Sequence, residues 1–179
     1  MKKVLVKDIL HAKEKRFFLQ KKLLQKYQQS LIVINLNIPG AKKNKKLYQI
    51  FFNKVVKPKW WFFLQKQQLK SKIMLTQELK DLAGIGLIIV YQENYPSFLK
   101  ILKKKFLYLE QIEKNFMLVD IDLIDPLHRF ISRIDLQQLP RNCFLCSQPA
   151  KICAIQKKHS TENLIFFVDS LIIKALEQI

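Results

Sequence analysis

Helical spacing of apolar residues predicts four helices along the chain. The charged stretch 7–29, which contains no Gly or Pro, predicts an amphipathic helix, and 47–58 predicts a second. A third helix is expected over 98–114, with Ser97 as its N-cap, and a fourth is expected to begin after Ser160. The expected apolar positions are Leu10, Phe17, Leu24 and Tyr27 in the first helix and Leu164, Val168, Leu171 and Ala175 in the last.

Short apolar runs rich in β-branched residues predict three strands. The first covers 31–36 and is followed by the tight turn 37–40, which contains Pro-Gly. The other two, 86–92 and 116–124, flank the long third helix, and their crossover would be right-handed if they are parallel. The aromatic run 60–64 fits either a strand or the start of a helix.

These elements predict one α+β domain over residues 1–179, with a mixed β-sheet flanked by helices. An irregular Cys- and Arg-rich segment, 125–159, is expected to lie across the sheet before the terminal helix. The chain is 49% hydrophobic with only three glycines, which supplies a core and excludes disordered or collagen-like classes. The longest uncharged apolar stretch, Leu82 to Tyr91, is about half of the roughly 20 residues that a membrane span needs.

A cytoplasmic location is expected from the N-terminus and the cysteines. The apolar run Val4–Val6 meets Lys7 and Asp8 at once, which is too short for the apolar region of a secretory signal. Three cysteines, an odd number, fit a reducing compartment and a local site better than a disulfide framework.

Charge favours a polyanionic partner. The formal net charge is +18, and the first 72 residues carry 19 basic and 2 acidic side chains. Only four of the 32 basic residues are arginines, and three of these fall in the irregular segment: Arg129, Arg133 and Arg141. Because the planar guanidinium binds phosphate through two donors, we expect Arg133 and Arg141 to face a polyphosphate. The lysines at 151, 157 and 158 also fit a solvated basic loop.

Two carboxylates share one face of the third predicted strand. Asp120 and Asp122 are two residues apart, so both side chains point to the same side of the sheet. Such a pair is neutralised by a bound Mg²⁺ or by nearby cations, and Asp125 is close enough in sequence to be a third carboxylate. The alternative is a strand whose polar face meets water.

Four candidate zinc ligands lie within seventeen residues. Cys143, Cys146, Cys153 and His159 begin with the C-x-x-C spacing of structural zinc sites, which predicts a Cys₃His site. Cysteine is also common as a small buried apolar residue, and a histidine at a helix start can serve as a cap. A cysteine nucleophile is less favoured, because the spacing identifies no catalytic dyad.

Several short motifs together resemble a known family. The chain resembles the apo-citrate lyase phosphoribosyl-dephospho-CoA transferases, also called holo-citrate lyase acyl-carrier-protein synthases, over nearly its whole length. In order, the motifs are Leu36-Asn37-Ile38-Pro39-Gly40 followed by lysines, Asp120-Ile121-Asp122, Ser132-Arg133, Arg141-Asn142-Cys143-Phe144-Leu145-Cys146, Ala150-Lys151-Ile152-Cys153 and Lys158-His159-Ser160. The chain departs from the family's usual Gly-Arg at Phe116-Met117 and from its usual Arg-Ser near Ile155-Gln156, and Lys157 or Lys158 is a candidate replacement for a missing cation.

The resemblance implies nucleotidyltransferase-type chemistry. A 2′-(5″-triphosphoribosyl)-3′-dephospho-CoA unit would be transferred to a serine of the acyl-carrier subunit of citrate lyase, with release of pyrophosphate. Asp120 and Asp122 would hold Mg²⁺ and act in catalysis with Arg133, while Arg141, Arg129 and Lys158 would bind the donor. The general base is left open between Asp122 and Asp125, and the basic N-terminal part would dock the carrier.

Two other classes of function fit parts of the sequence. A non-catalytic zinc-knuckle module would use its lysines on nucleic acid and stack bases on the aromatic run from Trp60 to Phe63. An inactive scaffold would only bind the citrate lyase subunit.

Overall fold

The computed structural model describes residues 5–179, so Val4 of the short N-terminal apolar run lies outside the described residues. No helix within that range is both long and apolar enough to cross a membrane. The four strands are β1 (Ser30–Leu36), β2 (Ile73–Asp81), β3 (Gly84–Tyr91) and β4 (Val119–Ile124). The α-helices are α1 (Val6–Tyr27), α2 (Lys46–Phe51), α3 (Lys57–Lys66), α4 (Pro96–Ile112), α5 (Ala150–Ile155) and α6 (Thr161–Leu176). The predicted α+β class is confirmed.

The sheet has the strand order β2-β3-β1-β4. All three pairings are antiparallel, so the predicted mixed pairing is wrong. The strands β3 and β4 do run in the same direction, but β1 lies between them and is antiparallel to both. The predicted strand–helix–strand unit therefore exists as β3-α4-β4, with the largely buried strand β1 inserted between its two strands.

The edge strand β2 was not predicted from the sequence. Most of its side chains are exposed or half-buried, and Gln77 interrupts the apolar alternation of Leu75 and Leu79 that would mark a strand. It forms a hairpin with β3 through the two residues Leu82 and Ala83. Pairing with the buried strand β3, and not its own pattern, holds it in the sheet.

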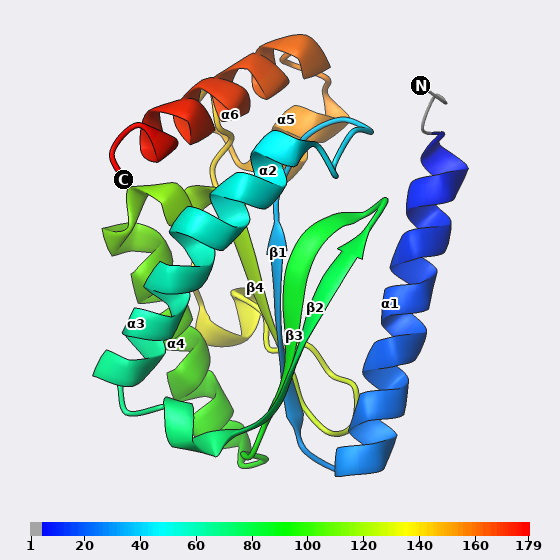
Figure 1. The fold of residues 1–179 in the computed structure, drawn as a ribbon, viewed down its shortest axis with the longest axis vertical. Coiled ribbons are helices and arrows are strands. Elements are labelled where there is room, and N and C mark those ends of the chain that lie inside the picture. The colour runs from blue at the N-terminus through cyan, green and yellow to red at the C-terminus, as the bar shows by residue number, and fades with distance from the viewer. Residues whose placement is uncertain (1–4) are drawn as a thin grey trace.

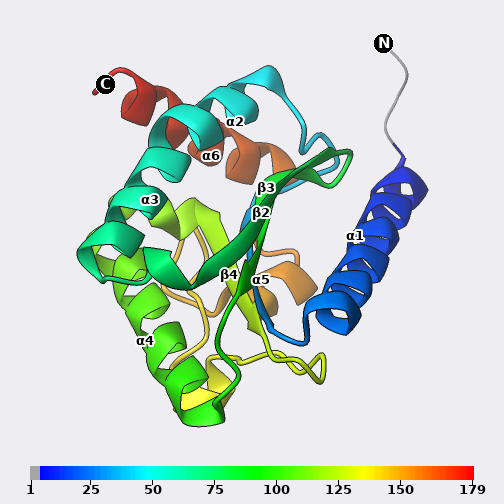
Figure 2. The same cartoon turned by 60° about the horizontal axis from the view of Figure 1, so that its bottom comes forward.

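Helices cover the two faces of the sheet unequally. Figures 1 and 2 show α1 alone on one side and α2, α3, α4 and α6 on the other. The main core lies on the four-helix side, where Tyr48, Trp60, Phe106 and Val168 pack against the sheet. A smaller apolar cluster lies beneath α1 and includes Leu23, Leu24 and Val33.

The helical segment from Lys46 to Lys66 does not end at Pro58, as the apolar spacing predicted. A π-helical turn, η1 (Phe52–Val56), joins α2 to α3 and precedes the proline, which stands in the first turn of α3. At this position Pro58 is tolerated, because a missing N–H donor costs least near a helix start. The ambiguous aromatic run 60–64 is therefore helical.

The caps of the later helices agree only in part with prediction. Ser160 is the N-cap of α6, and its Oγ accepts a hydrogen bond from the Asn163 amide at 3.1 Å. Ser97 does not cap α4, because the helix begins two residues earlier than predicted, at Pro96, with Tyr95 as N-cap. Proline pre-sets the backbone angle of the first helical residue, which favours this earlier start.

The buried face of α1 is centred on an arginine. Leu10 and Phe17, two of the predicted apolar contacts, are exposed, whereas Arg16 is buried. The Arg16 guanidinium donates to both carboxylate oxygens of Asp81 at 2.8 and 2.9 Å, to Asn35 Oδ1 at 2.7 Å and to the Gly84 carbonyl at 2.6 Å. These hydrogen bonds of Arg16 fix α1 to β1 and to the β2-β3 hairpin.

Replacing Arg16 with methionine is expected to lower the free energy of unfolding by about 2 kcal/mol, because Asp81 and a buried carbonyl lose their partner. Urea unfolding followed by circular dichroism measures the change. The control is Lys57→Met, which removes an exposed ion pair with Glu78 and should change stability by less than about 0.5 kcal/mol. Equal losses in the two variants would contradict a structural role for Arg16.

Candidate functional site

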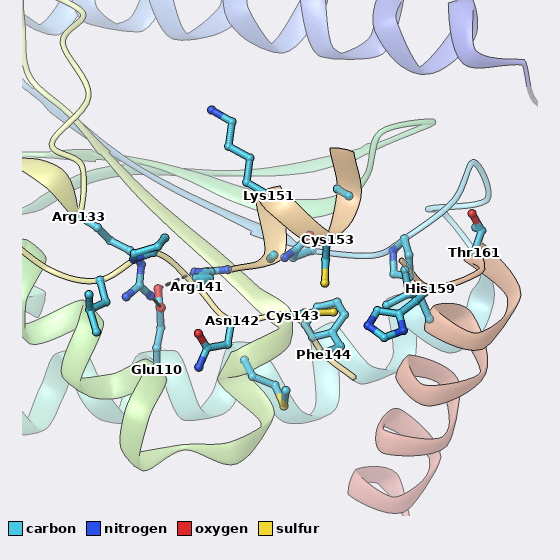
Figure 3. A pocket seen from close by; sticks show the side chains of 18 of the residues that line it. Glu110, Arg133, Arg141, Asn142, Cys143, Phe144, Lys151, Cys153, His159 and Thr161 are labelled. Atoms are coloured by element: carbon cyan, nitrogen blue, oxygen red, sulfur yellow. Dashed lines mark hydrogen bonds and ion pairs between the residues drawn. The ribbon is translucent and has the colours of Figure 1, made fainter. Parts of the chain in front are cut away.

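A cavity of about 1100 Å³ lies where the end of β1, the end of α4 and the irregular C-terminal segment meet. This volume is at the upper end of the range of small-molecule sites. Figure 3 shows Glu110, Arg133 and Arg141 at one end of it and Cys143, Cys153 and His159 at the other. Its charged lining consists of Glu110 with four cations: Arg133, Arg141, Lys151 and Lys157. The excess of cations suits an anionic ligand.

Glu110 joins the two arginines that the sequence singled out. Arg133 donates to one carboxylate oxygen of Glu110, and Arg141 donates to the other at 2.7 Å. The Glu110 side chain is only 7% exposed, and its burial raises its pKa in spite of the two guanidinium groups. Glu110 was not predicted as a site residue, because in sequence it is one of several charged residues on an amphipathic helix.

Arg141 also connects the cavity to the aspartate pair. Its Nη1 lies 2.5 Å from Asp120 Oδ1, and its Nη2 donates to the Val119 carbonyl at 2.8 Å. Lys103 of α4 donates to the Ile121 carbonyl of β4, two residues after Val119 on the same edge of the strand. The two cations thus satisfy two carbonyls on the edge of β4 that faces away from β1, and the Ile131 amide donates to a third, that of Leu123, at 2.8 Å.

Asp120 and Asp122 lie on the face of the sheet that α1 covers, opposite the main core. They pair across the strands with Asn35 and Val33, and Val33 belongs to the apolar cluster beneath α1. The predicted alternation is confirmed, since Ile121 between them is buried in the main core. Neither aspartate lines the cavity; Asp120 reaches it through Arg141.

The carboxylate of Asp122 is largely desolvated. Burial, and then the neighbouring charge of Asp120, raise its pKa, although Lys103 and Arg141 oppose this. Among residues 5–179 no side chain or amide donates a hydrogen bond to it. A desolvated carboxylate without a partner, two residues from a second one, fits a Mg²⁺ ion, which binds through one or two carboxylates and substrate phosphates.

Asp125 does not complete this pair. Its buried carboxylate accepts hydrogen bonds from the amides of Leu127 and Arg129 at 2.9 and 2.8 Å and from Arg129 Nε at 2.7 Å. These bonds give the carboxylate a role in closing its own turn, so they do not support the prediction of a third metal-binding carboxylate. Arg129 is correspondingly held by Asp125 and does not line the cavity. Of the adjacent lysines 157 and 158, Lys157 lines the cavity and Lys158 does not.

The three cysteines and His159 come together at the far end of the cavity. One ligand atom from each of the four residues lies within 4.8 Å of the others. Cys146 Sγ is 3.4 Å from Cys153 Sγ and 3.3 Å from His159 Nε2. His159 and the backbone amide of Gln148 lower the pKa of Cys146 to about 6, whereas burial raises that of Cys153 to about 11. The fold thus also creates a thiol–imidazole contact that the sequence spacing did not identify.

A family model described as apo-citrate lyase phosphoribosyl-dephospho-CoA transferase matches residues 4–175. The chain belongs to this transferase family. Proteins named probable apo-citrate lyase phosphoribosyl-dephospho-CoA transferase are similar to it in Streptococcus pyogenes, with 32% identity over 92% of this chain and 83% of that protein, and in Vibrio cholerae, with 28% identity over 92% and 89%. Protein CitXG of Haemophilus influenzae is 28% identical over 94% of this chain, which corresponds to 35% of its own length.

Most of the motifs that carried the family resemblance contribute to the cavity wall, with the exception of the aspartate pair. Asn37, Pro39 and Gly40 of the first motif line it, as do the Arg141 and Lys151 blocks. At Gly40 a Cβ atom would meet the Ile165 side chain at 3.0 Å, and the backbone has a positive φ, so glycine suits this close approach of the loop to α6.

The two departures from the family pattern differ in their surroundings. Phe116 is buried in the main core, while Met117 lines the cavity where an arginine is usual in the family. Ile155 is 74% exposed and does not line the cavity. Lys157, two residues later, supplies a cation to the lining.

Proposed function

We propose that this chain transfers the 2′-(5″-triphosphoribosyl)-3′-dephospho-CoA unit to a serine of the citrate lyase acyl-carrier subunit and releases pyrophosphate. The observation that carries this proposal is Arg141, which borders the large cation-lined cavity and at the same time contacts Asp120 of the aspartate pair. Membership of the transferase family supplies the chemical class of donor and acceptor.

The arginines would bind the polyphosphate of the donor. Both guanidinium groups donate to Glu110, so a triphosphate in the cavity would compete with this one buried carboxylate for the N–H donors of the two arginines. Because each guanidinium has five N–H donors, each can contact a phosphate oxygen without leaving Glu110 entirely. Glu110 would therefore position Arg133 and Arg141 toward the cavity, with Arg133 acting on the transferred phosphate.

Asp120 and Asp122 would hold Mg²⁺, which neutralises charge on the phosphate oxygens and on the leaving pyrophosphate. The acceptor serine oxygen forms a bond to the phosphorus attached to the ribose, and the bond from that phosphorus to pyrophosphate breaks. The serine proton passes to a carboxylate. Of the two candidates from the sequence, Asp125 already accepts three hydrogen bonds and Asp122 would hold Mg²⁺, so the choice of base stays open between them.

The acceptor would dock on the basic N-terminal part. Acyl-carrier proteins are commonly acidic, and α1 carries six exposed lysines: Lys7, Lys13, Lys15, Lys21, Lys22 and Lys26. This helix covers the sheet face that bears the two aspartates, so a carrier bound along it approaches the reacting groups. A cytoplasmic location, where such a carrier would be met, stays a prediction.

The nucleic-acid alternative loses part of its basis in the structure. Trp60 and Phe63, two of the residues proposed to stack on bases, are buried in the main core, and only Phe62 of the aromatic run is largely exposed. Base stacking needs exposed ring faces.

Intact-mass spectrometry of the apo-carrier tests the proposed function. Incubation with the donor and Mg²⁺ should increase the mass of the carrier by the mass of the donor minus the mass of pyrophosphate. The added group should be on a serine, and one pyrophosphate should be released per carrier modified. Omission of Mg²⁺ or chelation should stop the reaction. Complex formation without transfer would support the scaffold alternative, and salt-sensitive binding of RNA with no transfer would support the nucleic-acid module; either result overturns the proposal.

The transfer rate is expected to fall as the pH is lowered. The midpoint of this acid limb of the pH–rate profile should lie above the ordinary aspartate pKa of 3.8, because burial raises the pKa of Asp122. A ligand carboxylate must be ionised, so activity is present above the raised pKa and is lost as pH falls through it. Lys103→Gln should move the limb to higher pH, since it removes a charge that lowers the pKa of Asp122. The exposed Lys100→Gln is the control and should leave it unmoved. Coincident pH profiles for Lys103→Gln and the unmodified protein would contradict this assignment.

A further inference from the structure

We infer that Cys143, Cys146, Cys153 and His159 bind one Zn²⁺ ion that holds the far wall of the cavity together. The inference concerns this chain's own residues and does not depend on the proposed transfer reaction. It would add a structural metal centre, separate from the aspartate pair.

The four side chains have the dimensions of a tetrahedral site. With zinc–sulfur bonds of about 2.3 Å and a zinc–nitrogen bond of about 2.0 Å, ligand atoms stand roughly 3.5 to 3.8 Å apart. The observed contacts of Cys146 with Cys153 and His159, at 3.4 and 3.3 Å, are close to these edges. All four ligand atoms fall within 4.8 Å of one another, so a single ion can reach every one.

The local backbone is arranged as a knuckle around the first two cysteines. The Cys143 amide donates to the Gln148 carbonyl at 2.8 Å, and the Ala150 amide donates to the Arg141 carbonyl at 2.8 Å. These two bonds form a short antiparallel turn that returns the chain from Cys146 to α5, where Cys153 lies. The last ligand, His159, directly precedes the cap of α6.

Apolar packing does little to hold this part of the chain. Leu139 is 84% exposed and Ile155 is 74% exposed, and Cys153 is the one buried residue between 137 and 160. A helix of six residues such as α5 is not stable by itself. One ion would cross-link the knuckle, α5 and the start of α6, and would supply the stability that burial does not.

This cross-link would also hold in place the part of the cavity wall that carries Arg141. Cys143, Cys153 and His159 all line the cavity, and Arg141 stands two residues before the first of them. Phe144, between the first two ligands, stacks on Phe167 of α6 with ring centres 6.3 Å apart, so the knuckle is seated on the core from one side only. We expect loss of zinc to loosen the backbone that presents Arg141.

A cysteine nucleophile activated by His159 is the competing explanation of the same contact. A nucleophile of this kind requires one thiol and one imidazole. It does not explain why two further thiols lie at the same point. The two explanations differ in reactivity: a zinc-bound thiolate is protected from alkylation until the metal is removed, whereas a free low-pKa thiolate reacts at once.

Metal analysis of the full-length chain, purified without chelator or histidine tag, is expected to find about one zinc per chain. Cys146→Ser and His159→Ala should retain less than about a tenth of an equivalent, while His11→Ala, on the exposed side of α1, should retain all of it. Less than a tenth of an equivalent in the unmodified chain, or iron in place of zinc, would overturn the inference.

A second measurement needs no variant and so is unaffected by misfolding. Exchange of the native metal for Co²⁺ should give the visible absorption of tetrahedral cobalt with thiolate charge-transfer bands. Iodoacetamide should label the three cysteines slowly before chelation and at least ten-fold faster after it. Fast labelling of Cys146 alone before chelation, or a Cys146–Cys153 disulfide in the purified protein, would show that the site does not hold zinc.

Discussion

Replacing Asp122 or Asp120 with asparagine is expected to lower the rate of carrier modification by about 10³-fold, with little loss of stability. Asparagine keeps the size and one oxygen of the side chain but removes the charge that would hold Mg²⁺ on the triphosphate. Because the pKa of Asp122 is raised by burial and by Asp120, removal of one charge relieves repulsion in the free protein. The folded state should therefore tolerate either change.

Single-turnover transfer at saturating donor, followed by intact mass, measures this loss. Raising the Mg²⁺ concentration should recover part of the rate in the Asp120→Asn variant, since Asp122 still offers one ligand. Glu177→Gln, on the exposed end of α6, serves as the matched loss of a carboxylate and should keep the full rate. A rate within ten-fold of the unmodified protein in both aspartate variants would refute the proposed metal role.

Arg141→Lys is expected to lower the transfer rate by about 100-fold in spite of the conserved charge. The guanidinium contacts Glu110, Asp120 and the Val119 carbonyl at once, and a single ammonium cannot span these three positions. With lysine, fewer donors remain for the phosphates, so charge developing on the leaving pyrophosphate is less well stabilised. Transfer measured at several donor concentrations separates the maximal rate from the apparent affinity.

A stability control is needed because Arg141 also satisfies the edge of β4. Arg16→Lys removes an equally forked arginine that does not line the cavity, and it should lower the urea midpoint while leaving the rate of the folded protein within about three-fold. If Arg141→Lys and Arg16→Lys lose rate in proportion to stability, Arg141 has only a structural role. A fall in rate for Arg141→Lys at unchanged midpoint supports phosphate contact.

Local patterns predicted most of the main-chain elements. The first, third and last long helices, the strands β1, β3 and β4, and the cap at Ser160 follow from apolar periodicity and capping preferences. The failures have specific physical causes: the polar strand β2 depends on its pairing with β3, and Pro58 stands at a tolerated position near the start of α3.

Site residues were predictable where the motif itself carried the chemistry. Arg133 and Arg141 at the cavity, the aspartate pair on one strand face and the four candidate zinc ligands that the fold brings together were all singled out by residue type and spacing. Glu110, Lys103 and Arg16 were not, because each is a charged residue on an amphipathic helix until the fold buries it. Asp125 was overrated for the opposite reason, since its sequence position is close to the pair but its carboxylate closes a turn.

The amino-acid sequence alone determined the secondary structure of most of the chain, the alternation of Asp120 and Asp122 on one strand face, and the family, because these depend on neighbours within a few residues or on motifs read in order. Only the tertiary structure decided that β1 separates β3 from β4, that α1 covers the aspartate face, and that Arg141 reaches from Glu110 to Asp120. Those contacts join residues distant in the chain, and their energies come from burial and charge pairing, which no local pattern contains.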